Sequence, residues 1–215
     1  MHKTQLKISE IFHSIQGEST LAGFPTVFVR LTGCPLRCTW CDTEYAFAGG
    51  QWMEIEDIIE HIKSFQTPYV CVTGGEPLAQ KRCINLLDKL TENGFNVSLE
   101  TSGAVSIANV NDSITTVMDL KAPGSGEEQK NLYENINYLD AKDQIKFVIK
   151  DRTDYHWSLE TIKRYNLIDK CEILFSPVAG EINPTDLAQW ILDDKLLVRF
   201  QLQLHKILWD DAQGR

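Results

Sequence analysis

Short apolar runs rich in valine, isoleucine and phenylalanine alternate along the chain with stretches whose apolar residues recur at helical spacing. Runs of this length and composition are typical of buried β-strands. The pattern predicts strands at 26–33, 68–74, 96–103, 115–121, 144–150, 172–178 and 197–204.

The intervening stretches predict helices, because their apolar residues gather on one face. The clearest case is 53–65, where Ile55, Ile58, Ile59 and Ile62 fall at i, i+3, i+4 and i+7, which is one face of a helix. The predicted helices are 53–65, 79–93, 127–139, 153–166 and 184–194.

The order of these elements predicts the fold. Strands alternating with helices imply parallel strands joined by right-handed crossovers, in an open sheet or a barrel. The segments GCPLRC, GGEP, ETSG and DLKAPGSGE each follow or close a predicted strand, and α/β barrels gather their sites at the C-terminal ends of strands. The sequence therefore favours an α/β fold, a partial (β/α)6-type TIM-like barrel, with residues 1–215 in a single domain.

Composition and charge narrow the function. The chain has 215 residues and a net charge of −9, which argues against a broad nucleic-acid surface because such a surface needs clustered lysine and arginine. No apolar run is long enough for a membrane span, and the polar N-terminus does not read as a signal peptide. We expect a cytoplasmic protein that acts on small molecules, without nucleic-acid or membrane partners.

Six cysteines divide into two kinds. Three lie in or beside apolar runs, where a free cysteine commonly acts as a small hydrophobe: Cys71, Cys83 and Cys171. The other three share the loop CPLRCTWCDT after the first predicted strand, at the spacing C-x3-C-x2-C: Cys34, Cys38 and Cys41. Their spacing points to a metal centre.

The three-cysteine loop fits an iron–sulfur cluster better than structural zinc. A closed zinc site needs four ligands, and no fourth cysteine or histidine stands at ligand spacing beside this loop. Iron–sulfur clusters are held by cysteine thiolates, and three thiolates on a four-iron cluster leave one iron open to chelate a small molecule. Trp40, next to Cys41, would shield such a cluster from solvent.

The cysteine loop together with GGEP after the second strand resembles the radical S-adenosylmethionine (SAM) superfamily. The resemblance implies a [4Fe-4S] cluster on Cys34, Cys38 and Cys41 whose open iron binds SAM, with cleavage of SAM to a 5′-deoxyadenosyl radical. Gly74 and Gly75 allow close backbone approach, and Glu76 can accept a hydrogen bond from the SAM ammonium.

The flanking sequence resembles one branch of that superfamily, the 7-carboxy-7-deazaguanine synthases of queuosine and deazapurine biosynthesis. The resemblance rests on SIQGE, FVRLTGCPLRCTWCDT, VTGGEP, LETSG, DLKAP and LQLHK. It implies a carbon–nitrogen lyase that converts 6-carboxy-5,6,7,8-tetrahydropterin to 7-carboxy-7-deazaguanine with loss of ammonia. A glycyl-radical enzyme activase and a non-enzymatic iron–sulfur or zinc module are the alternatives.

The same resemblance assigns roles to individual residues. Those expected to contact SAM are Trp40, Asp42, Gly75, Glu76, Ser102, Asp119, Leu120 and Lys121. Those expected to contact the pterin are Ile15, Gln16, Gly17, Glu18, Arg30, Thr73 and His205. Thr43 offers an oxygen of the kind that Mg²⁺ accepts. Lys121 and Lys146 could instead pair with surface acids.

The resemblance also implies partners: an electron donor such as flavodoxin or ferredoxin, and a second copy of the chain in a homodimer. Two positions depart from the family pattern. Ser19 stands where glycine is expected, so the local turn is expected to differ. The chain ends in ILWDDAQGR rather than in a proline soon after His-Lys, so no role is assigned to Arg215.

Overall fold

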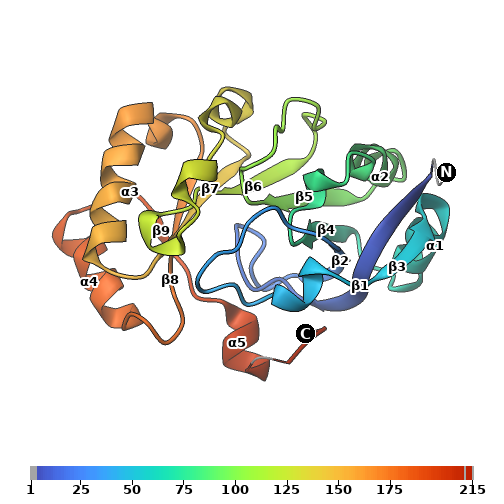
Figure 1. The fold of residues 1–215 in the computed structure, drawn as a ribbon, viewed down its shortest axis with the longest axis horizontal. Coiled ribbons are helices and arrows are strands. Elements are labelled where there is room, and N and C mark those ends of the chain that lie inside the picture. The colour runs from blue at the N-terminus through green and yellow to red at the C-terminus, as the bar shows by residue number, and fades with distance from the viewer. Residues whose placement is uncertain (1–3, 211, 215) are drawn as a thin grey trace.

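A twisted sheet of nine strands organises the computed structural model, which describes residues 4–210 and 212–214. Its spatial order is β3-β1-β2-β4-β5-β6-β7-β8-β9 (Figure 1). The strands are β1 (Gln5–Ile15), β2 (Pro25–Leu31), β3 (Gln51–Glu54), β4 (Tyr69–Gly74), β5 (Asn96–Thr101), β6 (Thr115–Asp119), β7 (Gln144–Ile149), β8 (Glu172–Pro177) and β9 (Arg199–Phe200).

The strand directions confirm the predicted partial barrel. From β2 through β9 each neighbouring pair is parallel, whereas β1 pairs antiparallel with both β2 and β3. The sheet is open, with β3 and β9 as its edges. Parallel strands bring their C-terminal ends to one rim, so the loops that follow β2, β4, β5 and β6 meet there.

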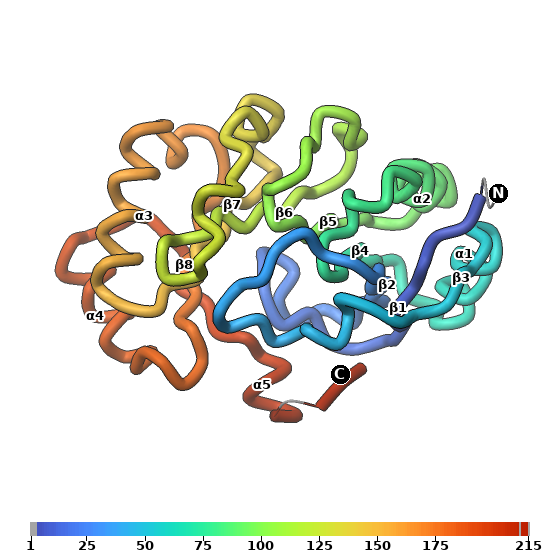
Figure 2. The backbone as a smooth tube through the Cα atoms, viewed as in Figure 1, coloured from blue at the N-terminus to red at the C-terminus, as the bar shows by residue number. Residues whose placement is uncertain are grey.

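Four of the six connections between the parallel strands carry an α-helix: α1 (Ile55–Ser64), α2 (Cys83–Glu92), α3 (Arg152–Tyr165) and α4 (Pro184–Asp193). The predicted helix at 53–65 is confirmed, and its four isoleucines are buried in the core. A fifth helix, α5 (Leu204–Trp209), follows the sheet. The tube in Figure 2 shows α5 and the C-terminal segment passing back toward the side of the molecule that carries β1.

Two predicted elements are wrong. The segment 127–139 forms only 3₁₀ turns, at Glu128–Lys130 and Tyr133–Tyr138. Within them, buried Asn135 donates to the carbonyls of Gly103 and Val105 and accepts from the amide of Ile107. A buried side-chain amide must satisfy its hydrogen bonds, and this turn lets Asn135 do so by tying down the loop between β5 and β6.

The strand predicted at 197–204 shrinks to Arg199–Phe200. After Phe200 the chain leaves the sheet and bonds to the loop that follows β1. The side-chain oxygen of Gln201 accepts from the amide of Ser19 at 2.9 Å, and the amide of Leu204 donates to the carbonyl of Gly17 at 3.2 Å. These bonds connect the segment after the last strand to the segment after the first.

Candidate active site

A cavity of about 590 Å³ opens among the loops at the C-terminal ends of the parallel strands. It receives residues from the loop after β1, the cysteine loop, the ends of β4 to β8, and α5. All but two of the residues predicted from the sequence line this one cavity: Ile15, Gln16, Gly17, Glu18, Arg30, Cys34, Cys38, Trp40, Cys41, Asp42, Thr43, Thr73, Gly75, Ser102, Asp119, Lys121 and His205.

The three cysteines are free, partly exposed thiols on the loop after β2. The loop after β6 holds this segment in place: the Thr39 hydroxyl donates to the carbonyl of Gly124 at 2.9 Å, and the Thr39 amide to the carbonyl of Ser125 at 3.1 Å. Arg37 lies over the ring of Phe47 and donates to the carbonyl of Cys34 at 2.8 Å. The cysteine loop is therefore held in place by contacts with the loop after β6 and with Phe47.

The three thiols of the cysteine loop fit a four-iron cluster and do not fit a single metal ion. Among residues 4–210 and 212–214, no three histidine, cysteine, aspartate or glutamate side chains converge closely enough to hold one metal ion. A four-iron cluster binds each thiolate on a different iron, so its ligands lie further apart than around one ion. Burial raises the pKa of the Cys34 thiol and raises that of Cys38 to about 11, and the positive charge of Lys121 opposes both shifts. Iron binding would displace the thiol protons.

Gly75 packs directly against the cysteine loop. A Cβ atom built on Gly75 would lie 2.5 Å from the carbonyl oxygen of Gly33 and 2.7 Å from the Cβ of Cys34. No larger residue fits there without a backbone shift. The amide of Glu76 donates to the same Gly33 carbonyl at 2.8 Å, so the GGEP segment and the cysteine loop form one unit.

Glu76 and Leu120 are the two predicted residues that do not line the cavity. Leu120 is fully buried, and its backbone amide donates to the carbonyl of Lys146. The carboxylate of Glu76 is also fully buried, and it accepts from the amide of Leu78 and from groups of Thr101 and Ser102. In this structure Glu76 therefore positions the end of β5, and its carboxylate does not reach the cavity.

Arg30 enters the cavity with a partner that sequence reasoning missed. Its Nε lies 2.7 Å from Oε1 of Glu10, and the hydroxyl of Tyr45 donates to the same oxygen at 2.8 Å. Burial alone would lower the pKa of Arg30, yet Tyr45 and Glu10 raise it above its ordinary value. Because Glu10 occupies Nε, the outer guanidinium nitrogens can bind an anion.

A cluster of mostly buried charges also lines the cavity. The Nζ of Lys146 lies 2.9 Å from Oε2 of Glu18 and 3.7 Å from Oδ2 of Asp119, and Lys121 lies 2.9 Å from the same Asp119 oxygen. These lysines pair with acids that line the cavity, so the alternative that they pair with surface acids does not hold. Burial would lower the pKa of Lys146, but Glu18 and Asp119 raise it well above its ordinary value.

Glu100 is a further cavity residue that the sequence did not single out. It lies at the end of β5 and accepts from Gln16 at 3.3 Å and from the hydroxyl of Thr73 at 3.2 Å. Its place at the C-terminal end of a predicted strand was the available signal, because α/β barrels gather their sites at those ends.

The start of α5 contacts the segment after β1 and the cysteine loop beside the cavity. A Cβ atom built on Gly17 would lie 2.7 Å from Nδ1 of His205, so glycine is needed for this approach. Asp42, on the cysteine loop, lies 3.5 Å from Nζ of Lys206 in α5. Burial alone would raise the pKa of Asp42, but Lys206 and Gln203 hold this pKa below its ordinary value.

Ser19 adopts the left-handed conformation that glycine would take, with a φ of 70°. Its hydroxyl accepts from the amide of Leu21 at 3.1 Å. The turn therefore keeps a glycine-like shape despite the substitution. Ala212, Gln213 and Gly214 also line the cavity, whereas Arg215 lies outside the described residues.

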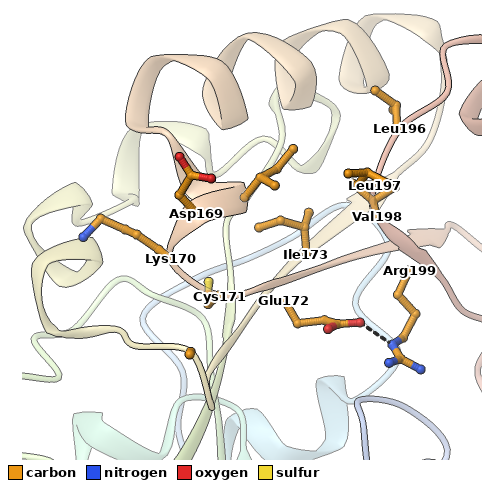
Figure 3. Close-up of a pocket in the computed structure, with 11 residues that line it drawn as sticks. Asp169, Lys170, Cys171, Glu172, Ile173, Leu196, Leu197, Val198 and Arg199 are labelled. Atoms are coloured by element: carbon orange, nitrogen blue, oxygen red, sulfur yellow. Dashed lines mark hydrogen bonds and ion pairs between the residues drawn. The ribbon is translucent and has the colours of Figure 1, made fainter.

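A second hollow, of about 690 Å³, lies at the N-terminal ends of β7, β8 and β9, the opposite end of these strands from the loop that carries Cys34, Cys38 and Cys41 (Figure 3). Apolar side chains such as Ile173 and Leu197 line it, and the ion pair between Glu172 and Arg199, at 2.7 Å, lies beside them. No residue predicted to be functional lines this hollow, and it offers no converging reactive groups.

Comparisons with known proteins agree with this geometry. The radical SAM superfamily model matches residues 28–167. A 7-carboxy-7-deazaguanine synthase of Chlorobaculum tepidum is 43% identical over 213 residues, covering 97% of each chain. This chain belongs to the 7-carboxy-7-deazaguanine synthase family of radical SAM proteins. A synthase of Thermoplasma acidophilum is 38% identical and covers 96% of this chain and 99% of its own.

The fold has a solved counterpart. The crystal structure of QueE from Escherichia coli superposes with a TM-score of 0.76 at 24% identity, and covers 93% of this chain and 94% of that one. Radical SAM membership implies a [4Fe-4S] cluster and SAM, and the family relationship does not favour a glycyl-radical activase. Among the described residues, no helix is long and apolar enough to cross a membrane.

Proposed function

We propose that this protein is a 7-carboxy-7-deazaguanine synthase, a carbon–nitrogen lyase that contracts the ring of 6-carboxy-5,6,7,8-tetrahydropterin and releases ammonia. One observation carries the proposal. The cysteine loop and the polar groups suited to a carboxypterin line the same cavity, in a chain related over nearly its full length to synthases of that name. The proposed domain is the whole of 1–215.

The cofactor half of the cavity comprises the cysteine loop and the ends of β4, β5 and β6. Cys34, Cys38 and Cys41 would hold the cluster, which together with SAM supplies a radical that removes a hydrogen atom from the substrate. The Oδ1 atom of Asp119 is buried without a hydrogen-bond partner among the described residues, which suits a SAM hydroxyl or amine. Further SAM contacts are proposed for Trp40, Asp42, Gly75, Ser102, Lys121 and the backbone of Leu120.

The substrate half would bind the pterin by its two ends. The planar fork of Arg30 suits the substrate carboxylate, and Glu10 and Tyr45 hold that fork in place. At the other end, Glu18 would accept from the aminopyrimidine N–H groups. The remaining contacts are proposed for Ile15, Gln16, Gly17, Thr73 and His205.

Mg²⁺ is proposed to bind at Thr43, whose hydroxyl lies 3.4 Å from Oδ1 of Asp42. Hydroxyl and carboxylate oxygens are hard ligands of the type this ion prefers, and substrate oxygens and waters would complete its shell. We also propose a cytoplasmic homodimer that receives electrons from flavodoxin or ferredoxin.

Anaerobic turnover with product detection by mass spectrometry tests the proposed function. Reconstituted enzyme, reductant, SAM, Mg²⁺ and 6-carboxy-5,6,7,8-tetrahydropterin should give 7-carboxy-7-deazaguanine and ammonia, and Cys38→Ala should give neither. Cys171→Ala is the matched control, because Cys171 is a buried thiol outside the cavity. SAM cleavage without the deazaguanine product would refute this substrate.

A further inference from the structure

Lys146 lies at the junction of the two halves of the cavity. It stands on β7 opposite Asp119 of β6, and its carbonyl accepts from the amide of Leu120 at 3.0 Å. Its ammonium lies 2.9 Å from Glu18 and 3.7 Å from Asp119, and the three side chains are only 13%, 10% and 14% exposed. One buried cation thus contacts an acid from each half.

The two acids do not depend on Lys146 equally. Asp119 has a second cation, because Nζ of Lys121 lies 2.9 Å from the same oxygen. Within the described part of the chain, Lys146 is the only cation that forms an ion pair with Glu18. Loss of the Lys146 charge should therefore affect Glu18 strongly and Asp119 only weakly.

We propose that Lys146 is a positioning residue for substrate recognition, which acts by holding the Glu18 carboxylate against the N–H donors of the bound pterin. This inference rests on the proposed function. Lys146 engages Oε2 of Glu18 and directs the carboxylate into the cavity. A buried carboxylate without its cation is strongly disfavoured, so without Lys146 the Glu18 side chain would turn away or accept a proton.

The proposal predicts a split between the two ligands. By calorimetric titration of the anaerobic reconstituted enzyme, Lys146→Met should raise the Kd for 6-carboxy-5,6,7,8-tetrahydropterin about tenfold or more. The Kd for SAM should change by less than about threefold, since Lys121 still neutralises Asp119. Thermal unfolding of each variant shows whether it is folded before titration.

Specificity provides a readout that general damage to the fold would not change. The matched analogue is the corresponding carboxytetrahydrolumazine, in which a carbonyl replaces the 2-amino group and repels Glu18. Wild-type enzyme should bind it at least about tenfold more weakly than the pterin, because a buried acceptor loses its donor. In Lys146→Met this preference should largely disappear.

Lys142→Met is the control. Lys142 precedes the same strand and also pairs with a buried acid, Asp143, at 3.1 Å, but it lies at the opposite end of the sheet from the cavity. The control should keep both Kd values and the preference for the pterin. Lys146→Gln is the second variant should Lys146→Met not fold, because it retains an N–H donor for Glu18.

A double-mutant cycle tests whether Lys146 acts through Glu18. In a Glu18→Gln background, Lys146→Met should raise the pterin Kd by less than about twofold further. Equal losses for pterin and SAM, or additive losses in the cycle, would overturn the role of Lys146. A wild-type enzyme that binds no carboxytetrahydropterin would overturn the proposed function itself, which is a separate result.

Discussion

Replacing Glu76 with glutamine should destabilise the protein although the side chain keeps its size. The Glu76 carboxylate is fully buried and accepts hydrogen bonds on both oxygens. Oε1 accepts from the amide of Leu78 at 2.9 Å, and Oε2 accepts from the amide of Ser102 at 2.7 Å and from its hydroxyl at 2.5 Å. The hydroxyl of Thr101 donates to both oxygens.

The size of the effect follows from this pattern. Glutamine has one acceptor oxygen and one donor nitrogen, so either orientation of its amide faces an N–H group with another N–H. One backbone amide, of Leu78 or Ser102, then loses its partner in the interior. An unsatisfied buried donor costs about 1–3 kcal/mol, and the remaining bonds lose their charge assistance, so we expect a loss of about 2–4 kcal/mol.

Urea unfolding of the cluster-free protein measures this loss without a contribution from bound iron. Glu92→Gln, on the exposed end of α2, is the matched control and should leave the unfolding free energy unchanged within about 0.5 kcal/mol. A Glu76→Gln protein as stable as this control would refute the reasoning, because it would mean that the buried amides find other partners.

Three further substitutions test other contacts. Ser19→Gly should change the unfolding free energy by less than about 1 kcal/mol, because glycine adopts the φ of 70° freely but loses the bond to Leu21; a larger loss in urea would contradict this. Tyr155→Phe should lower the free energy of unfolding by about 1–2 kcal/mol, because the lost hydroxyl bonds to Asp194 at 2.6 Å and to the carbonyl of Trp190 at 3.0 Å. An unchanged urea midpoint would show that these two bonds do not stabilise the fold. Arg30→Ala should raise the pterin Kd about tenfold or more and leave the SAM Kd unchanged; equal pterin Kd values would remove Arg30 from the binding site.

The sequence was informative about the parallel strands because they are buried on both faces. Such strands read as continuous apolar runs, and six of the seven predicted runs lie within two residues of the observed strands. Their polar C-terminal ends meet at one rim by topology alone. The family resemblance assigned residues as distant as Arg30 and Lys121 to one site, and this topology explains how both can line the same cavity.

The antiparallel edge was missed for the opposite reason. Strand β1 mixes lysine, glutamate and histidine with apolar residues, and its second half has no fully buried position. The partner of Arg30 was missed with it. Glu10 lies opposite Arg30 only after a register shift between Ile8 and Glu10, and a pattern of hydrophobic residues carries no information about such a shift.

The cysteine loop shows why a motif can be recognised without its geometry being predictable. Between the end of β2 and the turn at Glu44–Phe47 the loop has no regular secondary structure, and it has only a few hydrogen bonds of its own, such as the one from Arg37 to the carbonyl of Cys34. Further contacts come from GGEP after β4, through Gly75 and Glu76, and from the loop after β6, through Thr39. These contacts join segments that are 40 to 90 residues apart. The spacing of the cysteines can be read from ten consecutive residues of the sequence, whereas their orientation toward the cavity depends on strands that must first assemble in the correct order.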